Sequence, residues 1–279
     1  MKELPVLKAA LAAGGKILAA KFRRVTYKLK GRANLLTEAD LAAQAAVLRV
    51  IGAAFPGDGF MAEESPLRET PNGRLWIIDP LDGTTNYAHG FPAAAVSIAF
   101  SEGGVIKAGG VYDPFRNELF LAGKGSGAFV NGKKLAVSGV TALSRALLVT
   151  GFAYDRAERA EFYCRFFSDF MKISHDVRRM GAASLDLCWL AAGRTDGYWE
   201  FGLKPWDVAA GKLIVEEAGG KVTDFTGRAW EDIASMGSEN LATNGRIHGA
   251  MLKIIGARLR RSRPLIISRG RRPDGGRRR

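Results

Sequence analysis

The order of hydrophobic and polar residues along the 279-residue chain predicts helices and strands that alternate throughout. Leucine and isoleucine recur at three- and four-residue spacings over residues 4–22, which predicts an amphipathic helix. A second helix is expected over residues 38–55, because Thr37 suits its N-cap and Pro56 ends it. The chain therefore opens with a pair of helices.

Short β-type runs separated by glycine-rich turns replace the helical spacing after this pair. They cover residues 75–80, 93–100, 104–114, 117–123 and a hairpin over 127–138, with Asn131-Gly132 at its turn. Beyond residue 141 the pattern predicts a strand at 147–152, helices near 156–171 and 181–193, a strand at 196–202, a helix over 206–218, and a last short strand and helix that end near residue 256. Helices and sheets are thus interleaved along the whole chain.

Composition is that of a globular protein. Hydrophobic residues make up 47% of the chain, and no run approaches the roughly 18–20 apolar residues that span a bilayer. The first 22 residues carry lysines throughout, unlike an export signal. Cys164 and Cys188 lie in apolar helical surroundings without CxxC spacing, which favours buried, reduced thiols over a disulfide or a zinc site. We therefore expect a cytoplasmic protein that makes no membrane contact.

The net charge of +13 is concentrated at the C-terminus. Residues 257–279 hold ten arginines and one aspartate and contribute +9 of this charge. Because this Arg-rich tail has many like charges and no amphipathic period, we expect it to be disordered, apart from local contact through residues 265–267. Such a tail favours weak, salt-sensitive contact with nucleic acid.

Asp79 and Asp82 are the residues most indicative of chemistry, because aspartates are poor strand residues and these two end an apolar strand. With Pro80 and Gly83 shaping a turn, both carboxylates can point into one cleft, and the Leu81 carbonyl remains free as a further oxygen ligand. Oxygen ligands of this kind suit Mg2+. An ordinary Asx turn is the alternative interpretation of the two aspartates alone.

Neighbouring residues favour the metal site over the turn. Glu63 and Glu64 follow an apolar, glycine-rich stretch, and Asp207 stands at the start of a predicted helix, where by itself it would be a helix cap. Gly83 and the two threonines after it begin a short helical segment whose amides can hold a phosphate.

In its motifs the chain resembles the inositol monophosphatase family, within the wider group of lithium-sensitive sugar and nucleotide phosphatases. The resemblance covers about residues 4–256 and rests on NLLTEAD (34–40), AEES (62–65), WIIDPLDGTTNYAHGFP (76–92), GGVYDP (109–114), GSGAFVNGKKLAVS (125–138) and DGYWEFGLKPWDVAAGKLIVEEAGG (196–220). It implies an α/β (α+β) layered sandwich in an αβαβα arrangement. The active site would lie between an N-terminal metal-binding lobe, residues 1–140, and a C-terminal lobe, residues 141–256. A homodimer and inhibition by millimolar Li+ are also implied.

The resemblance further implies a site for two or three Mg2+ ions. Glu63, Asp79 and the Leu81 carbonyl would hold the first ion, and Asp79, Asp82 and Asp207 the second, so that Asp79 bridges the two. Carboxylates confined to one cleft repel each other, and the cations would supply the missing charge.

The implied reaction is direct attack of water on phosphorus, with no phosphoenzyme. Thr84 is similar in position to the family threonine that orients the attacking water, and Asp40 resembles the aspartate that accepts a hydrogen bond from it. With Glu63, these residues form the expected catalytic group. Asp40 alone would be an ordinary residue in the first turn of a helix.

Substrate contacts follow from the same resemblance. The Gly83 and Thr84 amides would hold the phosphate, and Glu200, Asp207 and the backbone around Ala183 the hydroxyls of a phosphorylated sugar or cyclitol.

At three positions this sequence differs from the family pattern or matches it imperfectly. Ala182 stands where relatives often carry Thr or Ser, and Asn34 replaces a frequent Asp. Lys30 resembles a family lysine near the third, weak metal position, although its spacing from the other motifs differs by one residue; the alternative is an ordinary surface lysine.

We therefore predict hydrolysis of a small phosphate monoester, first inositol monophosphate. Fructose 1,6-bisphosphate, histidinol phosphate or a 3'-phosphorylated nucleotide are alternative substrates, since these enzymes share the metal motifs. A different class of function remains open, that of an RNA or transcription-complex accessory protein acting through the basic tail.

Overall fold

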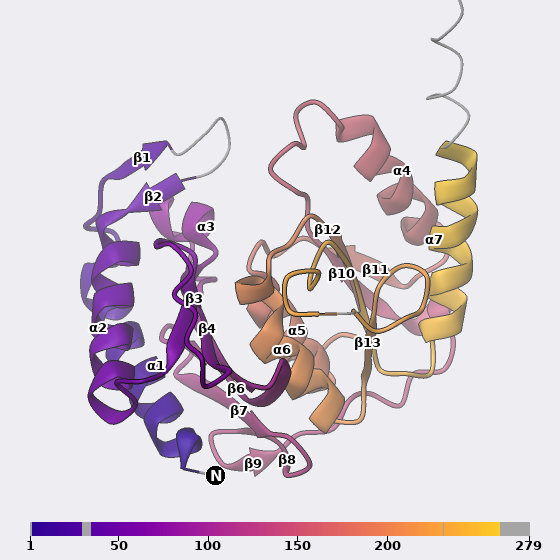
Figure 1. Cartoon of the computed structure of the whole chain (residues 1–279). Coiled ribbons are helices and arrows are strands. Elements are labelled where there is room, and N and C mark those ends of the chain that lie inside the picture. Colours follow the sequence, from indigo (N-terminus) through magenta and orange to yellow (C-terminus); the bar gives the residue numbers. More distant parts are fainter. Residues whose placement is uncertain (1, 30–34, 231, 263–279) are drawn as a thin grey trace, which may run out of the picture.

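The elements of the computed structural model stack as five layers in the order α-β-α-β-α (Figure 1). The structure describes residues 2–29, 35–230 and 232–262. The expected αβαβα layered fold is confirmed. Its helical layers are α1 (Glu3–Lys21) with α2 (Glu38–Ala54), then α5 (Ala183–Ala191) with α6 (Pro205–Glu217), and last α4 (Ala160–Met171) with α7 (His248–Ser262).

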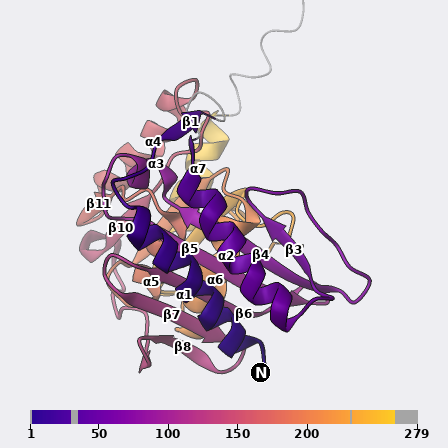
Figure 2. The same ribbon diagram turned by 90° about the vertical axis from the view of Figure 1, so that its left-hand side faces the viewer.

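The first sheet has seven strands in the order β3-β4-β5-β6-β7-β8-β9, and α1 and α2 lie across one of its faces (Figure 2). Neighbours are antiparallel, except that β3 and β4 run parallel. The strands are β3 (Gly59–Ala62), β4 (Arg74–Asp82), β5 (Ala95–Glu102), β6 (Val105–Asp113), β7 (Glu118–Gly123), β8 (Gly127–Val130) and β9 (Lys133–Lys134).

The second sheet has five strands in the order β11-β10-β12-β14-β13. Strand β10 is parallel to both neighbours, whereas β14 is antiparallel to both of its own. The strands are β10 (Leu147–Thr150), β11 (Asp176–Arg178), β12 (Gly197–Phe201), β13 (Lys221–Thr223) and β14 (Glu239–Thr243). Smaller elements are β1 (Tyr27–Leu29), its antiparallel partner β2 (Leu35–Thr37), the short α3 (Thr84–Ala88) and the 3-10 turn η1 (Leu143–Arg145).

Local signals in the sequence fix several of these boundaries. Thr37 caps α2 as expected, because its Oγ1 accepts the Ala39 N–H at 3.1 Å while its own N–H donates to the Asp40 carboxylate at 2.7 Å. The hairpin between β8 and β9 turns at Asn131 and Gly132, with φ of 47° and 80°. Two successive left-handed residues match the twist of an antiparallel pair.

Helix α5 of the middle layer is buried on all sides because it lies between the two sheets, whereas α6 leaves Glu216 exposed. Every residue of α5 is buried, including Cys188 as expected. Cys164, by contrast, is exposed, so its predicted burial is wrong. Helix α4 turns Tyr163, Phe166 and Phe170 into the core, and Cys164 falls on the outer side of that stripe.

The C-terminal helix is longer than the sequence predicted. Helix α7 continues past residue 257 to Ser262, so the expected disorder does not begin at residue 257. Arg258 donates to Asp169 of α4 at 2.6 Å, and Ile255 is fully buried, which together extend the packing of α7 beyond residue 256. The contact expected at residues 265–267 lies outside the described residues. None of the described helices is long and apolar enough to cross a membrane.

Several short strands were not predicted. They are β1, β2, β3, β11 and β13, each of three or four residues, too short for alternation to be recognised in the sequence. Helix α4 also begins at Ala160, after a loop, rather than near residue 156.

Candidate active site

Asp79 and Asp82 lie at the end of β4, where this strand has one more residue than its partner β5. Asp79 pairs with Ser97 and Asp82 with Ala95, so three steps along β4 match two along β5. Residues three apart in a regular strand point to opposite faces, and the extra residue of a β-bulge returns both side chains to one face. The turn predicted at Pro80 is therefore wrong: Pro80 lies inside β4, at the bulge, where a missing N–H is tolerated.

The first turn of α5 faces Asp82. The Asp82 carboxylate accepts the Ser184 N–H at 2.7 Å, the Ser184 hydroxyl at 2.5 Å and the Ala183 N–H at 3.3 Å. Amide groups at a helix N-terminus favour negative charge. The sequence analysis missed Ser184, whose only signal is its place in the first turn of a predicted helix.

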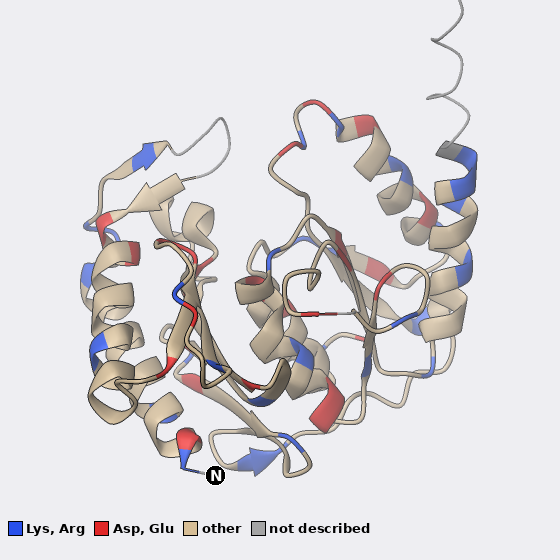
Figure 3. Cartoon of the chain, viewed as in Figure 1, with Lys and Arg blue, Asp and Glu red and all other residues tan. Residues whose placement is uncertain are grey.

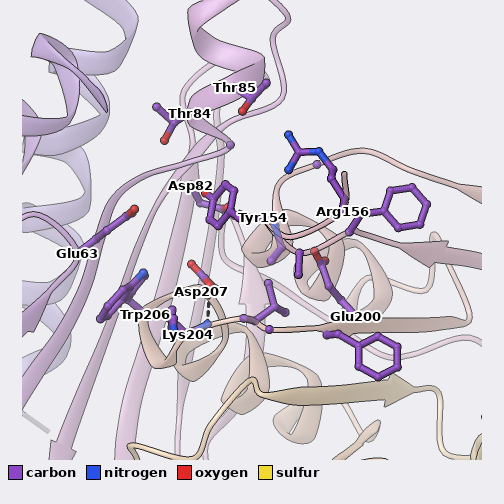
Figure 4. Close-up of a pocket in the computed structure, with 18 of the residues that line it drawn as sticks. Glu63, Asp82, Thr84, Thr85, Tyr154, Arg156, Glu200, Lys204, Trp206 and Asp207 are labelled. Carbon is purple, nitrogen blue, oxygen red and sulfur yellow. Dashed lines mark hydrogen bonds between the residues drawn. The ribbon is translucent and has the colours of Figure 1, made fainter. Parts of the chain in front are cut away.

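Glu63 and Asp207 complete the acidic group from two other elements. Glu63 follows β3, and its N–H donates to the Ile78 carbonyl of β4 at 3.2 Å. Asp207 lies in the first turn of α6, where its carboxylate accepts the Lys204 N–H at 2.7 Å. Figure 4 shows Glu63, Asp82 and Asp207 around one cavity. Asp79 lies beneath them with 1% of its surface exposed.

The carboxylates of Glu63, Asp79, Asp82 and Asp207 interact electrostatically with one another. Burial raises the pKa of Asp79 well above its ordinary value, and the charges of Glu63, Asp82 and Asp207 raise it further. Burial, then Asp82 and Glu63, raise the pKa of Asp207 in the same way. Carboxylates coupled like this share one site, and a divalent cation would remove their repulsion.

The chemistry of the donor set fits a hard cation. Four carboxylates and the Leu81 carbonyl offer only oxygen atoms, which Mg2+ prefers. Among the described residues, no group of three or more His, Cys, Asp or Glu side chains is already arranged closely enough to hold a metal ion. The Asp82 and Asp207 carboxylates each accept a backbone N–H and keep further oxygen lone pairs for a cation.

Thr84 is the first residue of α3, and its hydroxyl lies between two hydrogen-bond acceptors. Its Oγ1 lies 2.9 Å from the Leu81 carbonyl oxygen and 3.3 Å from Asp40 Oδ1, so the expected approach of Thr84 to Asp40 is present. One hydroxyl hydrogen serves one acceptor at a time. Burial raises the pKa of Asp40, and hydrogen bonds from Thr37 oppose that rise.

Gly83 connects the carboxylates to α3 in a conformation that favours glycine. Its φ is +85°, and an added Cβ would lie 2.7 Å from the Ala93 carbonyl oxygen. Ala182 is buried beside Gly83 and, as expected, offers no hydroxyl there. Lys30 and Asn34 lie outside the described residues.

The cavity beside these groups has a volume of about 230 Å³. Ala183 and Glu200 line it with the carboxylates, although the Ala183 N–H donates to Asp82. Burial raises the pKa of Glu200 to about 7, against the lowering effect of the hydrogen bond from Tyr198, 2.5 Å away. Gly151 makes room for it, because an added Cβ would lie 2.0 Å from its Oε2.

Asp186 of α5 is a buried acid behind the cavity. Neither of its oxygens has a hydrogen-bond partner in the described structure. Burial raises its pKa well above the ordinary value, Glu200 and Asp82 add to the rise, and Arg179 opposes it. A raised folded-state pKa means that stability falls as pH rises above the unfolded-state value of about 4.

We therefore expect Asp186→Asn to raise the melting temperature of the metal-free protein by about 2–4 °C at pH 8. The gain in melting temperature should shrink toward pH 5. The folded protein favours the neutral form of Asp186, and protonating this carboxylate on folding costs less free energy at lower pH. Thermal unfolding followed by circular dichroism at both pH values measures this. Equal gains at pH 5 and pH 8 would show that ionisation of Asp186 is not the cause.

Comparison with known proteins agrees with this architecture. A model described as the inositol monophosphatase family matches residues 2–262. The inositol-1-monophosphatase of Synechocystis sp. is 42% identical over 259 residues, which cover 89% of this chain and 86% of that protein. The Nus factor SuhB of Escherichia coli is 42% identical over 230 residues, covering 80% and 86%.

Solved structures give the same result. The inositol monophosphatase from Anabaena (Nostoc) sp. superposes with a TM-score of 0.82 at 42% identity, covering 92% of this chain and 96% of that one. The extragenic suppressor protein suhB from Bartonella henselae gives 0.86 at 37% identity, covering 91% and 98%. The fold and acidic cavity define a phosphatase of the generally metal-dependent kind. The chain belongs to the inositol monophosphatase family.

Proposed function

We propose that this protein is a Mg2+-dependent phosphatase that hydrolyses a small phosphate monoester, with inositol monophosphate the first candidate substrate. The observation that carries the proposal is the acidic group of Glu63, Asp79, Asp82 and Asp207 beside the Thr84 hydroxyl. The donor chemistry supports Glu63, Asp79, Asp82, Asp207 and the Leu81 carbonyl as the residues that would hold two or three ions. When bound, these ions would offset the carboxylate charge, lower the pKa of a water and stabilise charge on the leaving oxygen.

The protein's own groups have separate tasks in this proposal. Thr84, when it donates to Asp40, turns its oxygen lone pairs outward and can orient the attacking water. The amides of Gly83 and Thr84 would hold the phosphate oxygens. Glu200 has a pKa of about 7, so near neutrality it can accept from or donate to a substrate hydroxyl.

A panel of phosphate esters tests the proposal. Phosphate release is measured from inositol 1-phosphate, fructose 1,6-bisphosphate, histidinol phosphate and 3'-phosphoadenosine 5'-phosphate, each with Mg2+ and with EDTA. We expect turnover with Mg2+ only, and the ester turned over fastest names the substrate class. Absence of release from every ester would refute the proposal.

A transcription-associated role is the second candidate. Its support is the resemblance to proteins named Nus factor SuhB and the basic residues along α7 (Figure 3), including Arg260 and Arg261. Because α7 continues to Ser262, the informative truncation removes residues 263–279 and leaves the helix whole. RNA binding that falls with salt and is lost on this truncation would support the role; binding unchanged by truncation would exclude the tail from it.

A further inference from the structure

The helical layer on the outer face of the first sheet is incomplete. Helix α2 packs against β4, and α1 packs against β5 and β6. Figure 2 shows β7 and β8 beyond the edge of α1, without a described helix over them. Helix α6 covers these two strands on the opposite face. Two strands span about 10 Å, close to the width of one helix, so the outer face of β7 and β8 has room for a further helix beside α1.

This uncovered face is apolar. Leu121 of β7 and Phe129 of β8 are paired directly across the strands, so their side chains share a face, and Leu119 follows in alternation. Phe120 points the other way and is buried in the core that contains α5 and α6. Leu119, Leu121 and Phe129 are only partly buried, and with Leu4 of α1 they line a groove of about 820 Å³, here called the β7–β8 groove. An apolar groove on the surface indicates a binding site.

Two lysines flank the β7–β8 groove. Lys8 of α1 lines one side. On the other side, strand β9 consists of two lysines (Figure 3), and Lys134 shares a face with Phe129 because the two are paired directly. Both Lys8 and Lys134 are exposed, and neither forms an ion pair within the described chain. Of the described residues that line the groove, none is acidic, so the groove favours a negatively charged partner.

Two acidic residues near these strands are already bonded. Glu118, at the start of β7, alternates to the opposite face of the sheet and pairs with Arg194. Both oxygens of Glu217 accept backbone N–H groups, from Gly125 and Gly127, at 2.7 Å. Neither carboxylate therefore neutralises the lysines that flank the groove.

Charge distinguishes the candidate occupants of the groove. The C-terminal tail of this chain carries ten arginines over residues 257–279 and would bring positive charge to the lysines. A second copy that placed its own groove against this one would set Lys8 and Lys134 against their counterparts. Like charges across an interface are unfavourable. A partner with acidic residues removes this repulsion.

We propose that the β7–β8 groove binds an amphipathic helix of a partner protein, which presents apolar side chains to Leu121 and Phe129 and acidic side chains to Lys8 and Lys134. Such a helix would lie beside α1 and complete the helical layer of the first sheet. Its apolar residues recur at three- and four-residue spacings, with acidic residues on both flanks. The groove and the active-site cavity have no lining residue in common, so this proposal does not depend on the phosphatase function.

A synthetic peptide tests the proposal on the full-length protein. The fluorescent probe repeats Leu-Glu-Glu-Leu-Leu-Glu-Glu three times, which places leucines on one face of a helix and glutamates around them. One comparison peptide carries lysine in place of glutamate, and another has the same residues in an order that breaks the stripe. Fluorescence anisotropy at about 0.1 M salt gives Kd. We expect the acidic probe to bind at least about tenfold more tightly than either comparison peptide.

Reversal of the flanking charges is the first variant. Lys8→Glu/Lys134→Glu changes two exposed side chains and should weaken binding of the acidic probe at least about tenfold, while it tightens binding of the lysine peptide. Lys172→Glu/Lys253→Glu is the matched control, since it makes the same change at exposed lysines that do not line the groove. It should bind each peptide as the unchanged protein does. Equal binding of the acidic probe by the two double variants would overturn the proposal.

A charge within the groove is the second variant. Phe129→Asp should weaken binding of the acidic probe at least about tenfold, whereas Met171→Asp, at an exposed residue of α4 outside the groove, should leave it unchanged. Melting temperatures show whether both variants are folded. Unchanged binding by Phe129→Asp would overturn the proposal. Self-association in gel filtration that Phe129→Asp abolishes and Met171→Asp retains, without binding of the probe, would also overturn it and assign the groove to a second copy.

Discussion

Asp79→Asn is expected to lower kcat by about a thousandfold or more and to raise the melting temperature of the metal-free protein. Asp79 is the most buried of the four carboxylates, and the other three raise its pKa. An asparagine keeps the oxygen that accepts the Leu81 N–H at 2.9 Å but removes the charge. The remaining carboxylates then repel less, while the proposed metal site would lose one of its charged oxygen donors, a change expected to cost about 4 kcal/mol or more in the transition state.

Phosphate release and melting temperature, each with and without Mg2+, measure the Asp79→Asn effect together. Mg2+ should raise the melting temperature of the unchanged protein and much less that of the variant. Asp176→Asn makes the same chemical change at an exposed residue that pairs with Arg178, and should leave kcat and the Mg2+ shift as they are. Normal turnover by Asp79→Asn would remove Asp79 from the metal site.

Asp82→Asn would be a less clean test. Its carboxylate accepts three donors from Ser184 and Ala183 at the start of α5. An amide NH2 in place of one oxygen would face at least one of these donors, so the variant would lose stability as well as charge. The structure therefore distinguishes Asp79 from Asp82 by their hydrogen bonds, which the sequence does not show.

Thr84→Val is expected to lower kcat by about 100-fold or more, because it removes the hydroxyl that lies between the Leu81 carbonyl and Asp40. The Mg2+-induced rise in melting temperature should stay within 1–2 °C (~0.5 kcal/mol) of that of the unchanged protein, since valine removes no carboxylate. Lost turnover together with a retained response to Mg2+ would distinguish Thr84 from the proposed metal ligands.

Thr84→Ser is the matched control for the hydroxyl. It keeps the oxygen at the same position and should retain most of the turnover. If Thr84→Val hydrolyses the substrate as fast as Thr84→Ser, the hydroxyl does not orient the water. A loss of the Mg2+ response in Thr84→Val would point instead to a structural role at the end of β4.

The sequence predicted the acidic residues but not the geometry that unites them. Alternation along a regular strand would place Asp79 and Asp82 on opposite faces, and only the pairing with β5 reveals the extra residue. The layered fold was predictable because the long helices and strands have clear periods. Strands such as β3 and β11 were not, since their pairing comes from the sheet rather than from their own few residues.

The two arginines that line the cavity, Arg156 and Arg179, could not be recognised from the sequence. Arg156 and Arg179 are 23 positions apart among many arginines, and no spacing distinguishes them from Arg159 or Arg178, which are paired. Their difference lies in what surrounds them after folding. Ser184 is similar: a serine in the first turn of a helix is common, and its hydrogen bond to Asp82 depends on how α5 packs against β4.

The bulge in β4 makes this site sensitive to the length of the chain as well as to its chemistry. Leu81 is 1% exposed and packs in the core that α1 and α2 cover, so another apolar side chain could replace it at a modest loss of stability. Losing the residue altogether would leave the two aspartates two positions apart, where regular alternation keeps both on one face, but it would remove the Leu81 carbonyl that accepts the Thr84 hydroxyl. A substitution of Leu81 therefore changes only the core packing, whereas its deletion would change the backbone that connects the aspartates to Thr84.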